Sequence, residues 1–188
     1  MSTPSRKIKI LGIDPSMNNF GYAAASYDLD IKQLEYLSIR LNTPDKPKTK
    51  KSVRQNSIDL DLAKNQHKVL QQFLEWPDII CVEIPVGSQT SRAMTSYGLC
   101  IGVLASINKP MIQVTPTEVK VAATGNKSAT KREMINWAFS QNSSLKWLTR
   151  TTNGDNILID KNEHMADAMA AIKAGISTDE FKTILLSK

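Results

Sequence analysis

Apolar residues in this chain occur in two kinds of pattern, which predict two kinds of element. Short runs rich in isoleucine and valine, at residues 8–13 and 79–82, predict buried strands, because β-branched side chains pack well on a pleated sheet. Turn residues at Asn18-Asn19 and Leu29-Asp30 separate the first three runs and predict an antiparallel meander. The predicted strands cover residues 7–14, 19–28, 31–41, 78–84 and 110–114.

Longer stretches with apolar residues at helical spacing predict helices between and after these strands. Ile58, Leu62 and Val69 form such a stripe, and Trp76-Pro77 ends it, because the residue before a proline disfavours helix. Thr115-Pro116-Thr117-Glu118 is a capping box with proline at the first helical position. Residues 142–160 show neither pattern and are predicted to be irregular and polar. The predicted helices cover residues 57–75, 88–107, 116–125, 130–140 and 162–175, with a short terminal helix capped by Ser177-Thr178-Asp179-Glu180.

Three strands in a meander, followed by helix, strand, helix, strand and helix, is the element order of the ribonuclease H-like fold. This α/β fold has a central mixed five-stranded sheet, formed by the meander plus two strands and flanked by helices. The order also fits other α/β folds, so the fold prediction depends on motifs as well. Residues 1–188 are predicted to form one domain, with a basic flexible loop at about 42–55.

The composition is that of an ordinary globular protein, with 41% hydrophobic and 22% charged residues. No segment has the roughly 20 consecutive apolar residues that a bilayer-spanning helix needs, and no signal peptide is predicted. Cys81 and Cys100 lie in apolar surroundings without neighbours at zinc-ligand spacing, so they are predicted to be reduced core residues. These features predict a cytoplasmic protein, associated with the nucleoid, or located in the host cytoplasm if it is phage-encoded.

The net charge of +6 is concentrated in two stretches of the chain. Each stretch carries a local net charge of +4, so the remainder is slightly acidic. This distribution is typical of a polyanion-binding surface, although a soluble lysine-rich spacer explains the first stretch equally well. The basic residues are Lys46, Lys48, Lys50, Lys51 and Arg54 in the first stretch, and Lys120, Lys127, Lys131, Arg132, Lys146 and Arg150 in the second.

Two acidic residues end predicted buried strands, Asp14 the first strand and Glu83 the fourth. A carboxylate in such a place is costly to desolvate unless something neutralises it. His164 and Asp167 lie one turn apart on a predicted helix and share a face. We therefore predict that these four side chains form a divalent-metal site. Glu163 is an alternative to His164, because it also lies one turn from Asp167.

Several motifs occur together in one order along the chain, and each of them is weak alone. On their combination, the chain resembles the RuvC family of Holliday junction resolvases, bacterial and phage. The motifs are Gly12-Ile13-Asp14-Pro15-Ser16 with Gly21, Val82-Glu83, Thr115-Pro116-Thr117-Glu118-Val119-Lys120, Thr124-Gly125-Asn126-Lys127-Ser128-Ala129-Thr130-Lys131 and His164-Met165-Ala166-Asp167-Ala168-Met169-Ala170.

The resemblance implies a Mg²⁺-dependent endonuclease that resolves Holliday junctions or other branched DNA by two-metal phosphodiester hydrolysis. It implies that Asp14 bridges two Mg²⁺ ions, for which Mn²⁺ would substitute, with Glu83 on one side and Asp167 on the other. His164 departs from the many members that have aspartate there. An imidazole would ligate metal or relay a proton, and the alternative is a hydrogen-bonded surface histidine.

The resemblance also implies roles for basic residues. Lys131 is expected beside the scissile phosphate, where it stabilises transition-state charge. Lys120 has either a similar role or one in general phosphate steering. The remaining basic residues expected to contact the DNA backbone are Lys127, Arg132 and Arg92, with Lys48, Lys50 and Lys51 of the 42–55 loop.

Two further positions bear on DNA binding and assembly. Where bacterial relatives carry an aromatic residue that stacks on an unpaired base, this chain has Val86, so base stacking at that point is in doubt. The family uses the helix corresponding to 88–107 for a two-fold dimer, and small residues at Gly98 and Gly102 permit close helix approach. Simple packing of that helix on the sheet is the alternative.

Three other functions fit parts of the pattern. An RNA-processing nuclease of the same fold would share the acidic residues. A junction-binding protein that does not cut DNA is disfavoured, because the acidic side chains would weaken its binding. An actin-like ATPase also begins with a Gly-x-Asp strand, but this chain lacks glycine-rich phosphate loops.

Overall fold

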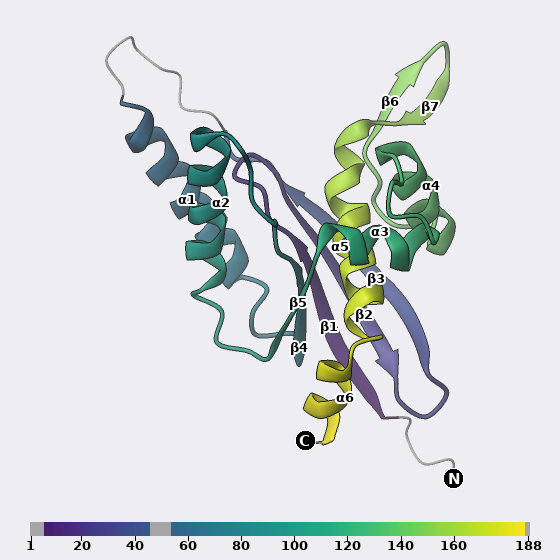
Figure 1. Ribbon diagram of the computed structural model, residues 1–188. Helices are drawn as coiled ribbons and strands as arrows, with labels where there is room; N and C mark the ends of the chain where they lie inside the picture. Colours follow the sequence, from purple (N-terminus) through teal and green to yellow (C-terminus); the bar gives the residue numbers. More distant parts are fainter. Residues whose placement is uncertain (1–5, 46–53, 187–188) are drawn as a thin grey trace.

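The computed structural model of the chain describes residues 6–45 and 54–186. Its main sheet has five strands in the order β3-β2-β1-β4-β5 (Figure 1). The first three strands form the predicted antiparallel meander, and β4 and β5 run parallel to β1, so the predicted mixed sheet is confirmed. The strands are β1 Lys7–Asp14, β2 Phe20–Asp28, β3 Gln33–Asn42, β4 Ile79–Glu83 and β5 Met111–Val114.

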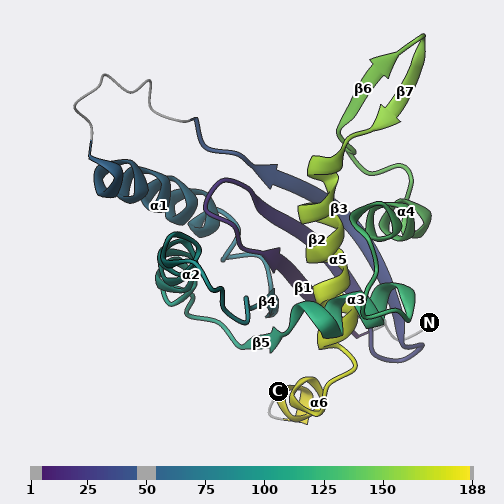
Figure 2. The same ribbon diagram turned by 45° about the horizontal axis from the view of Figure 1, so that its top comes forward.

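Helices cover both faces of the sheet, with α1 and α2 on one face and α5 on the other (Figures 1 and 2). Because side chains alternate along a strand, Leu11 and Ile13 of β1 join the core beneath α1 and α2. Ile10 of the same strand belongs to the core that α5 completes. The helices are α1 Gln55–Gln71, α2 Ser91–Leu104, α3 Pro116–Thr124, α4 Lys131–Gln141, α5 Glu163–Gly175 and α6 Asp179–Leu186.

Two glycines let α5 lie directly against the sheet. A Cβ atom at Gly12 would lie 2.0 Å from the carbonyl oxygen of Ala168, and one at Gly21 would lie 1.9 Å from the carbonyl oxygen of His164. Any larger residue would therefore push the helix backbone away from β1 and β2. The contact at Gly21 is important for the site because Gly21 pairs with Asp14 in the sheet register.

The prediction for residues 142–160 was wrong over half of its length. These residues form a hairpin, with strands β6 Thr149–Thr152 and β7 Asp155–Leu158 paired antiparallel. Asn153 and Gly154 make the turn with φ angles of 52° and 88°, which is the conformation that Asn-Gly favours in two-residue hairpin loops. A short 3₁₀ turn, Asp160–Asn162, then leads into α5.

Other local predictions agree with the structure. The capping box at Thr115 and Glu118 is present, and Thr130 with Glu133 forms a second one at the start of α4. Cys81 is buried in β4 and Cys100 is buried in α2, as free thiols. Within residues 6–45 and 54–186, no helix combines the length and hydrophobicity needed to cross a bilayer.

Candidate active site

The strand order brings two acidic residues to the same edge of the sheet. Asp14 is the last residue of β1, and Glu83 is the last residue of β4. The two strands are adjacent and parallel, with Ile13 aligned to Val82, so the carboxyl-bearing residues that follow them are neighbours. Asp14 is only 9% exposed, and carboxylates are seldom so buried unless they are paired.

The first turns of α5 add an imidazole and a third carboxylate to this edge. Nδ1 of His164 donates a hydrogen bond to Oδ2 of Asp14 at 2.6 Å. Asp167 lies one turn further along the same helix and is partly buried. Met165 and Met169 point into the core, as predicted, so His164 and Asp167 occupy the helix face toward the acidic strand ends.

The start of α5 is fixed by the fully buried Asn162. Its Nδ2 donates to the carbonyl oxygens of Leu148 at 2.7 Å and Ile159 at 2.9 Å, and its Oδ1 accepts from the backbone N–H of Leu148 at 2.9 Å. With Gly21 against the backbone of His164, these bonds hold the first turn of α5 in place. The imidazole and carboxyl groups of the site therefore sit on a rigid support.

Burial and like charge raise the pKa values of the three carboxyl groups. Desolvation and the charges of Asp14 and Asp167 raise the pKa of Glu83 to about 9. Desolvation and the charges of Asp14 and Glu163 raise the pKa of Asp167 to about 8. Desolvation also raises the pKa of Asp14, although the hydrogen bond from His164 partly offsets it. Each of these carboxyl groups therefore ionises less readily than usual, and a nearby cation would lower its pKa.

The pKa of His164 reflects two opposing effects. Burial disfavours the imidazolium, but the hydrogen bond and attraction to Asp14 outweigh it, so the pKa is raised. His164 thus lies beside Asp14 with its side chain only 17% exposed, and its role in the site stays a prediction.

Glu163 lies at the rim of the same cluster. Its Oε1 is 3.7 Å from Nε2 of His164, and its Oε2 is 2.7 Å from Nζ of Lys131. The sequence favoured His164 over Glu163, whereas the structure brings both to the site. The Lys131 pair is the contact that the sequence did not indicate, because it joins α4 to α5 across 32 residues.

Among the predicted basic residues, Lys120 also lies near the acids, since its charge lowers the pKa values of both Glu83 and Asp167. Lys127 is exposed in the turn between α3 and α4. Nη1 of Arg132 donates to the carbonyl oxygen of Leu158 at 3.1 Å. Lys120 and Lys131 therefore lie beside the acidic cluster.

The remaining predicted DNA contacts are located differently. Nη2 of Arg92 donates to Oδ1 of the buried Asp59 at 2.7 Å, so this guanidinium joins α2 to α1. Val86 is 77% exposed in the loop after β4. The predicted contacts Lys48, Lys50 and Lys51 lie outside the described residues.

The donor set suits a hard divalent cation, because it consists of carboxylate oxygens that carry like charge in a desolvated place. In the portion of the chain that the structure describes, no three acidic, histidine or cysteine side chains already surround a common point at ligand distances. Cation binding would thus require rotation of side chains in the cluster, while Oδ1 of Asp14 stays available beside the Oδ2 that bonds His164. The residues fit a metal by chemistry and mutual charge, and the proposed ligand set stays a prediction.

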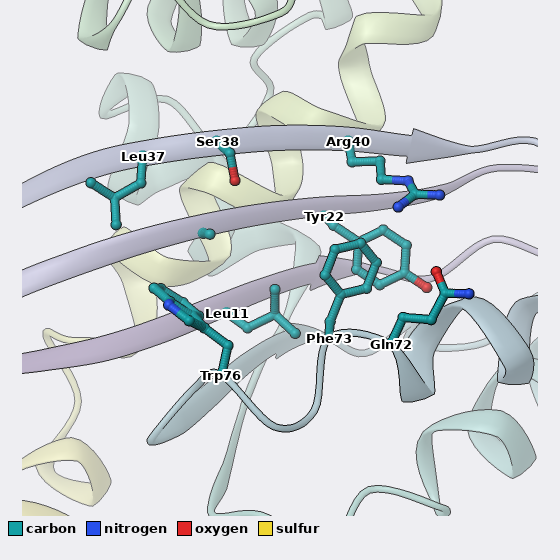
Figure 3. A pocket seen from close by; sticks show the side chains of 9 residues that line it. Leu11, Tyr22, Leu37, Ser38, Arg40, Gln72, Phe73 and Trp76 are labelled. Atoms are coloured by element: carbon teal, nitrogen blue, oxygen red, sulfur yellow. The ribbon is translucent and has the colours of Figure 1, made fainter.

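A separate cavity of about 290 Å³ lies on the other face of the sheet, between β2, β3 and the end of α1 (Figure 3). Tyr22 and Phe73 stack in it with ring centroids 4.7 Å apart, and Arg40 lies over Phe73. The Tyr22 hydroxyl is buried without a hydrogen-bond partner within residues 6–45 and 54–186. None of the predicted site residues lines this cavity, so it is distinct from the acidic cluster.

The outer face of α2 is open. Among residues 6–45 and 54–186, a Cβ atom at Gly98 or Gly102 would meet nothing within 4 Å, so these glycines do not serve packing on the sheet. Met94 and Ile101 on the same helix are each 48% exposed. Small and apolar residues therefore form a surface that the described part of the chain leaves uncovered.

Several known proteins to which this chain is similar are RuvC proteins or other Holliday junction resolvases. No family model matches the chain. A crossover junction endodeoxyribonuclease RuvC from Salinibacter ruber is 30% identical over 131 residues, which cover 66% of this chain and 67% of that protein.

Solved structures agree in fold. RuvC of Thermus thermophilus in complex with a Holliday junction substrate superposes with a TM-score of 0.61 and 18% identity, over 94% of this chain and 97% of that one. The yeast mitochondrial Holliday junction resolvase Ydc2 gives a TM-score of 0.55 and 15% identity, over 97% and 85% of the two chains. The predicted ribonuclease H-like α/β fold is confirmed by these likenesses.

Proposed function

This chain belongs to the RuvC family of Holliday junction resolvases, and from that membership we propose that it is a metal-dependent endonuclease that cuts four-way or otherwise branched DNA. The observation that carries the proposal is the convergence of three desolvated carboxyl groups at adjacent strand ends and the start of α5. The relatives add support, because one is a crossover junction endodeoxyribonuclease and another is bound to a Holliday junction.

Asp14, Glu83 and Asp167 are the proposed ligands for Mg²⁺, with His164 or Glu163 completing the set. Two bound Mg²⁺ ions would make a water molecule more acidic and stabilise the leaving oxygen. The raised pKa values of the three carboxyl groups support this assignment, because cation binding is the way such a cluster becomes fully ionised near neutral pH. Mn²⁺ is expected to substitute, since it accepts the same oxygen ligands.

His164 is proposed to move a proton at its Nε2 atom. With Nδ1 held by Asp14, the tautomer is fixed and Nε2 faces the rim of the cluster near Glu163. The raised pKa favours the imidazolium form of His164, which can donate a proton from Nε2. The reaction proposed is in-line water attack without a covalent intermediate, leaving nicks with 5′-phosphates.

Two lysines are proposed to bind the phosphate that is cut. Lys131 is held by Glu163 and is 69% exposed at its side chain, so a phosphate can approach its ammonium group directly. The charge of Lys120 lowers the pKa values of Glu83 and Asp167, so its ammonium group lies near these two proposed metal ligands. Both would stabilise charge that grows on the phosphoryl oxygens in the transition state.

The enzyme is proposed to act as a homodimer through the outer face of α2. The open positions at Gly98 and Gly102 support close approach of a second helix, and a two-fold symmetric enzyme suits a symmetric junction with two cut points. Burial of Met94 and Ile101 would supply apolar contact area.

The test is cleavage of labelled four-way, three-way and linear DNA and of structured RNA, with Mg²⁺, Mn²⁺ or EDTA. The proposal predicts metal-dependent nicks in branched DNA that a ligase seals, and little cutting of linear DNA or RNA. Preferential cutting of RNA would favour the RNA-processing alternative. Tight junction binding without cutting in any metal would make the chain a binding protein.

A further inference from the structure

The β6–β7 hairpin projects from the molecule at the end of α5 that carries the acidic cluster (Figures 1 and 2). All its strand residues except Thr152 and Leu158 are exposed. A two-stranded hairpin has marginal stability in water when no third element covers it. Packing in the core therefore does not explain why the hairpin is present.

The base of the hairpin is fastened to the site. Asn162 bonds to the backbone on both sides of the hairpin, at Leu148 before it and Ile159 after it. The backbone N–H of Ile159 also donates to the carbonyl oxygen of Leu148 at 3.2 Å, and Arg132 holds the carbonyl of Leu158. Because α5 begins at Glu163, directly after Asn162, the hairpin and the acidic cluster share one rigid mount.

The exposed surface of the hairpin is rich in hydrogen-bond donors. Arg150 supplies a guanidinium, and Thr149 supplies a hydroxyl group. Oγ1 of Thr151 donates to Oδ1 of Asn156 at 3.0 Å, a bond that does not use the Asn156 amide N–H groups. Guanidinium, hydroxyl and amide groups are those that contact DNA phosphates and base edges.

The shape of the hairpin also matches a duplex. Four residues per strand extend about 13 Å, and a major groove about 12 Å wide and 8.5 Å deep admits a two-stranded ribbon. The two-residue turn at Asn153 and Gly154 keeps the tip narrow.

We propose that the β6–β7 hairpin binds a duplex arm of the branched DNA beside the scissile phosphate, with Arg150 as its main phosphate contact. This inference rests on the proposed function and adds a specific contact surface to it. Since the hairpin is fastened to α5, binding of the arm sets the angle at which the acidic cluster meets the strand. The hairpin thereby contributes to selection of branched over linear DNA.

Charge reversal is the first test, with junction and linear duplex binding measured in EDTA so that the DNA stays uncut. Arg150→Glu should weaken four-way junction binding at least about tenfold, as loss of a charge-assisted phosphate contact does. It should also reduce the salt dependence of binding by about one ion. Lys182→Glu, the same charge change on α6 at the opposite end of α5, should alter binding less than about twofold.

Cross-linking is the second test and does not depend on a loss of binding. Cys81 and Cys100 are buried, so Thr151→Cys introduces a selectively labelled thiol for a photoactivated cross-linker. The labelled hairpin should cross-link to one arm next to the cut position, while labelled Lys182→Cys should not cross-link. Circular dichroism of Arg150→Glu and Thr151→Cys establishes that both variants keep the fold.

The outcomes separate this inference from the proposed function. If the wild-type chain cuts junctions while Arg150→Glu binds them normally and the labelled Thr151→Cys chain gives no adduct, the hairpin inference is wrong and the function stands. If the hairpin variants lose only binding to another protein, the surface is a protein contact and the inference is also wrong. Failure of the wild-type chain to bind any DNA would overturn both.

Discussion

The helices on the two faces of the sheet differ in what they leave exposed. In α5, 9 of 13 residues are buried, whereas in α2 only 3 of 14 are buried. The alanine-rich α5 lies within the fold, so the reactive groups at its start have a fixed support. The open face of α2 keeps small and apolar residues in contact with solvent. Thus α5 positions the acidic cluster on one face of the sheet, and α2 presents an exposed surface on the other face.

The space around individual glycines also differs between the α5 face and the outer surface of α2. At Gly12 and Gly21 a side chain would collide with the backbone of α5, but at Gly98 and Gly102 there is free space beyond the helix. The residue type is identical, and only the tertiary environment separates close packing within the chain from room for a partner.

The largest expected effect comes from removing a carboxylate on the α5 side. Asp14→Asn should reduce junction cleavage at least about 10³-fold, as loss of an essential active-site group does. Junction binding should be unchanged or tighter, because a negative charge has been removed. The measurement is single-turnover cleavage together with binding in EDTA.

Asp61→Asn is the matched control, because Asp61 is an exposed carboxylate on α1. It should cleave within about twofold of the wild-type rate. Equal losses in both variants, or loss of binding by Asp14→Asn alone, would show that Asp14 has a structural role instead.

A second test measures how the stability of the protein depends on pH, because Glu83 and Asp167 have raised pKa values. Carboxyl groups with raised pKa values hold protons that the unfolded chain releases near pH 4, so Glu83 and Asp167 stabilise the metal-free protein most below that pH. Their contribution to stability should fall from about pH 4 up to about pH 8 for Asp167 and about pH 9 for Glu83, by up to about 1.4 kcal/mol per pH unit for each group. The raised pKa of His164 acts in the same direction.

Chemical denaturation from pH 5 to 9, with and without Mg²⁺, measures this effect. Mg²⁺ should raise stability more at pH 8 than at pH 5, and Asp167→Asn should flatten the metal-free curve. A metal-free protein that becomes more stable as pH rises would contradict the assigned directions of the pKa shifts.

The third test compares the two kinds of glycine directly. Gly21→Ala should lower the free energy of unfolding by about 2–3 kcal/mol, because the new Cβ forces α5 from the sheet. Gly98→Ala should leave it unchanged or raise it by up to about 1 kcal/mol, because alanine favours helix. Urea denaturation of the two variants decides the matter, and similar losses in both would mean that α2 is not open at this position.

The smallest expected effect concerns assembly. Ile101→Asp should weaken the proposed dimer at least about tenfold by desolvating a charge at the interface, with little change in monomer stability. Val121→Asp is matched in exposure, 47% against 48%, but lies on α3. Sedimentation velocity should show a monomer only for the α2 variant. A dimer that survives Ile101→Asp would place the interface elsewhere.

Much of this organisation could be predicted from local sequence. Asp14 and Glu83 each end an apolar run, and parallel strands bring their carboxyl ends to one edge. The spacing of His164 and Asp167 fixed their shared helix face. These features depend on short-range periodicity, which the amino-acid pattern contains directly.

Other features depend on tertiary contacts or on weak signals. The Lys131–Glu163 pair forms only when α4 packs beside α5, and no local pattern indicates it. The hairpin was missed because its strands are mostly polar, although Asn153-Gly154 is a recognised hairpin signal. The orientation of Gly98 required knowledge of which face of α2 meets the sheet.

The most direct test of the account is a crystal of the protein grown with Mn²⁺ and measured for anomalous scattering. The account predicts manganese peaks within ligand distance of Asp14, Glu83 and Asp167, about 2.0–2.3 Å from their oxygens. The crystals are grown at a manganese concentration that supports cleavage in solution. The account would be contradicted if the carboxyl groups were well ordered and no anomalous peak lay between them.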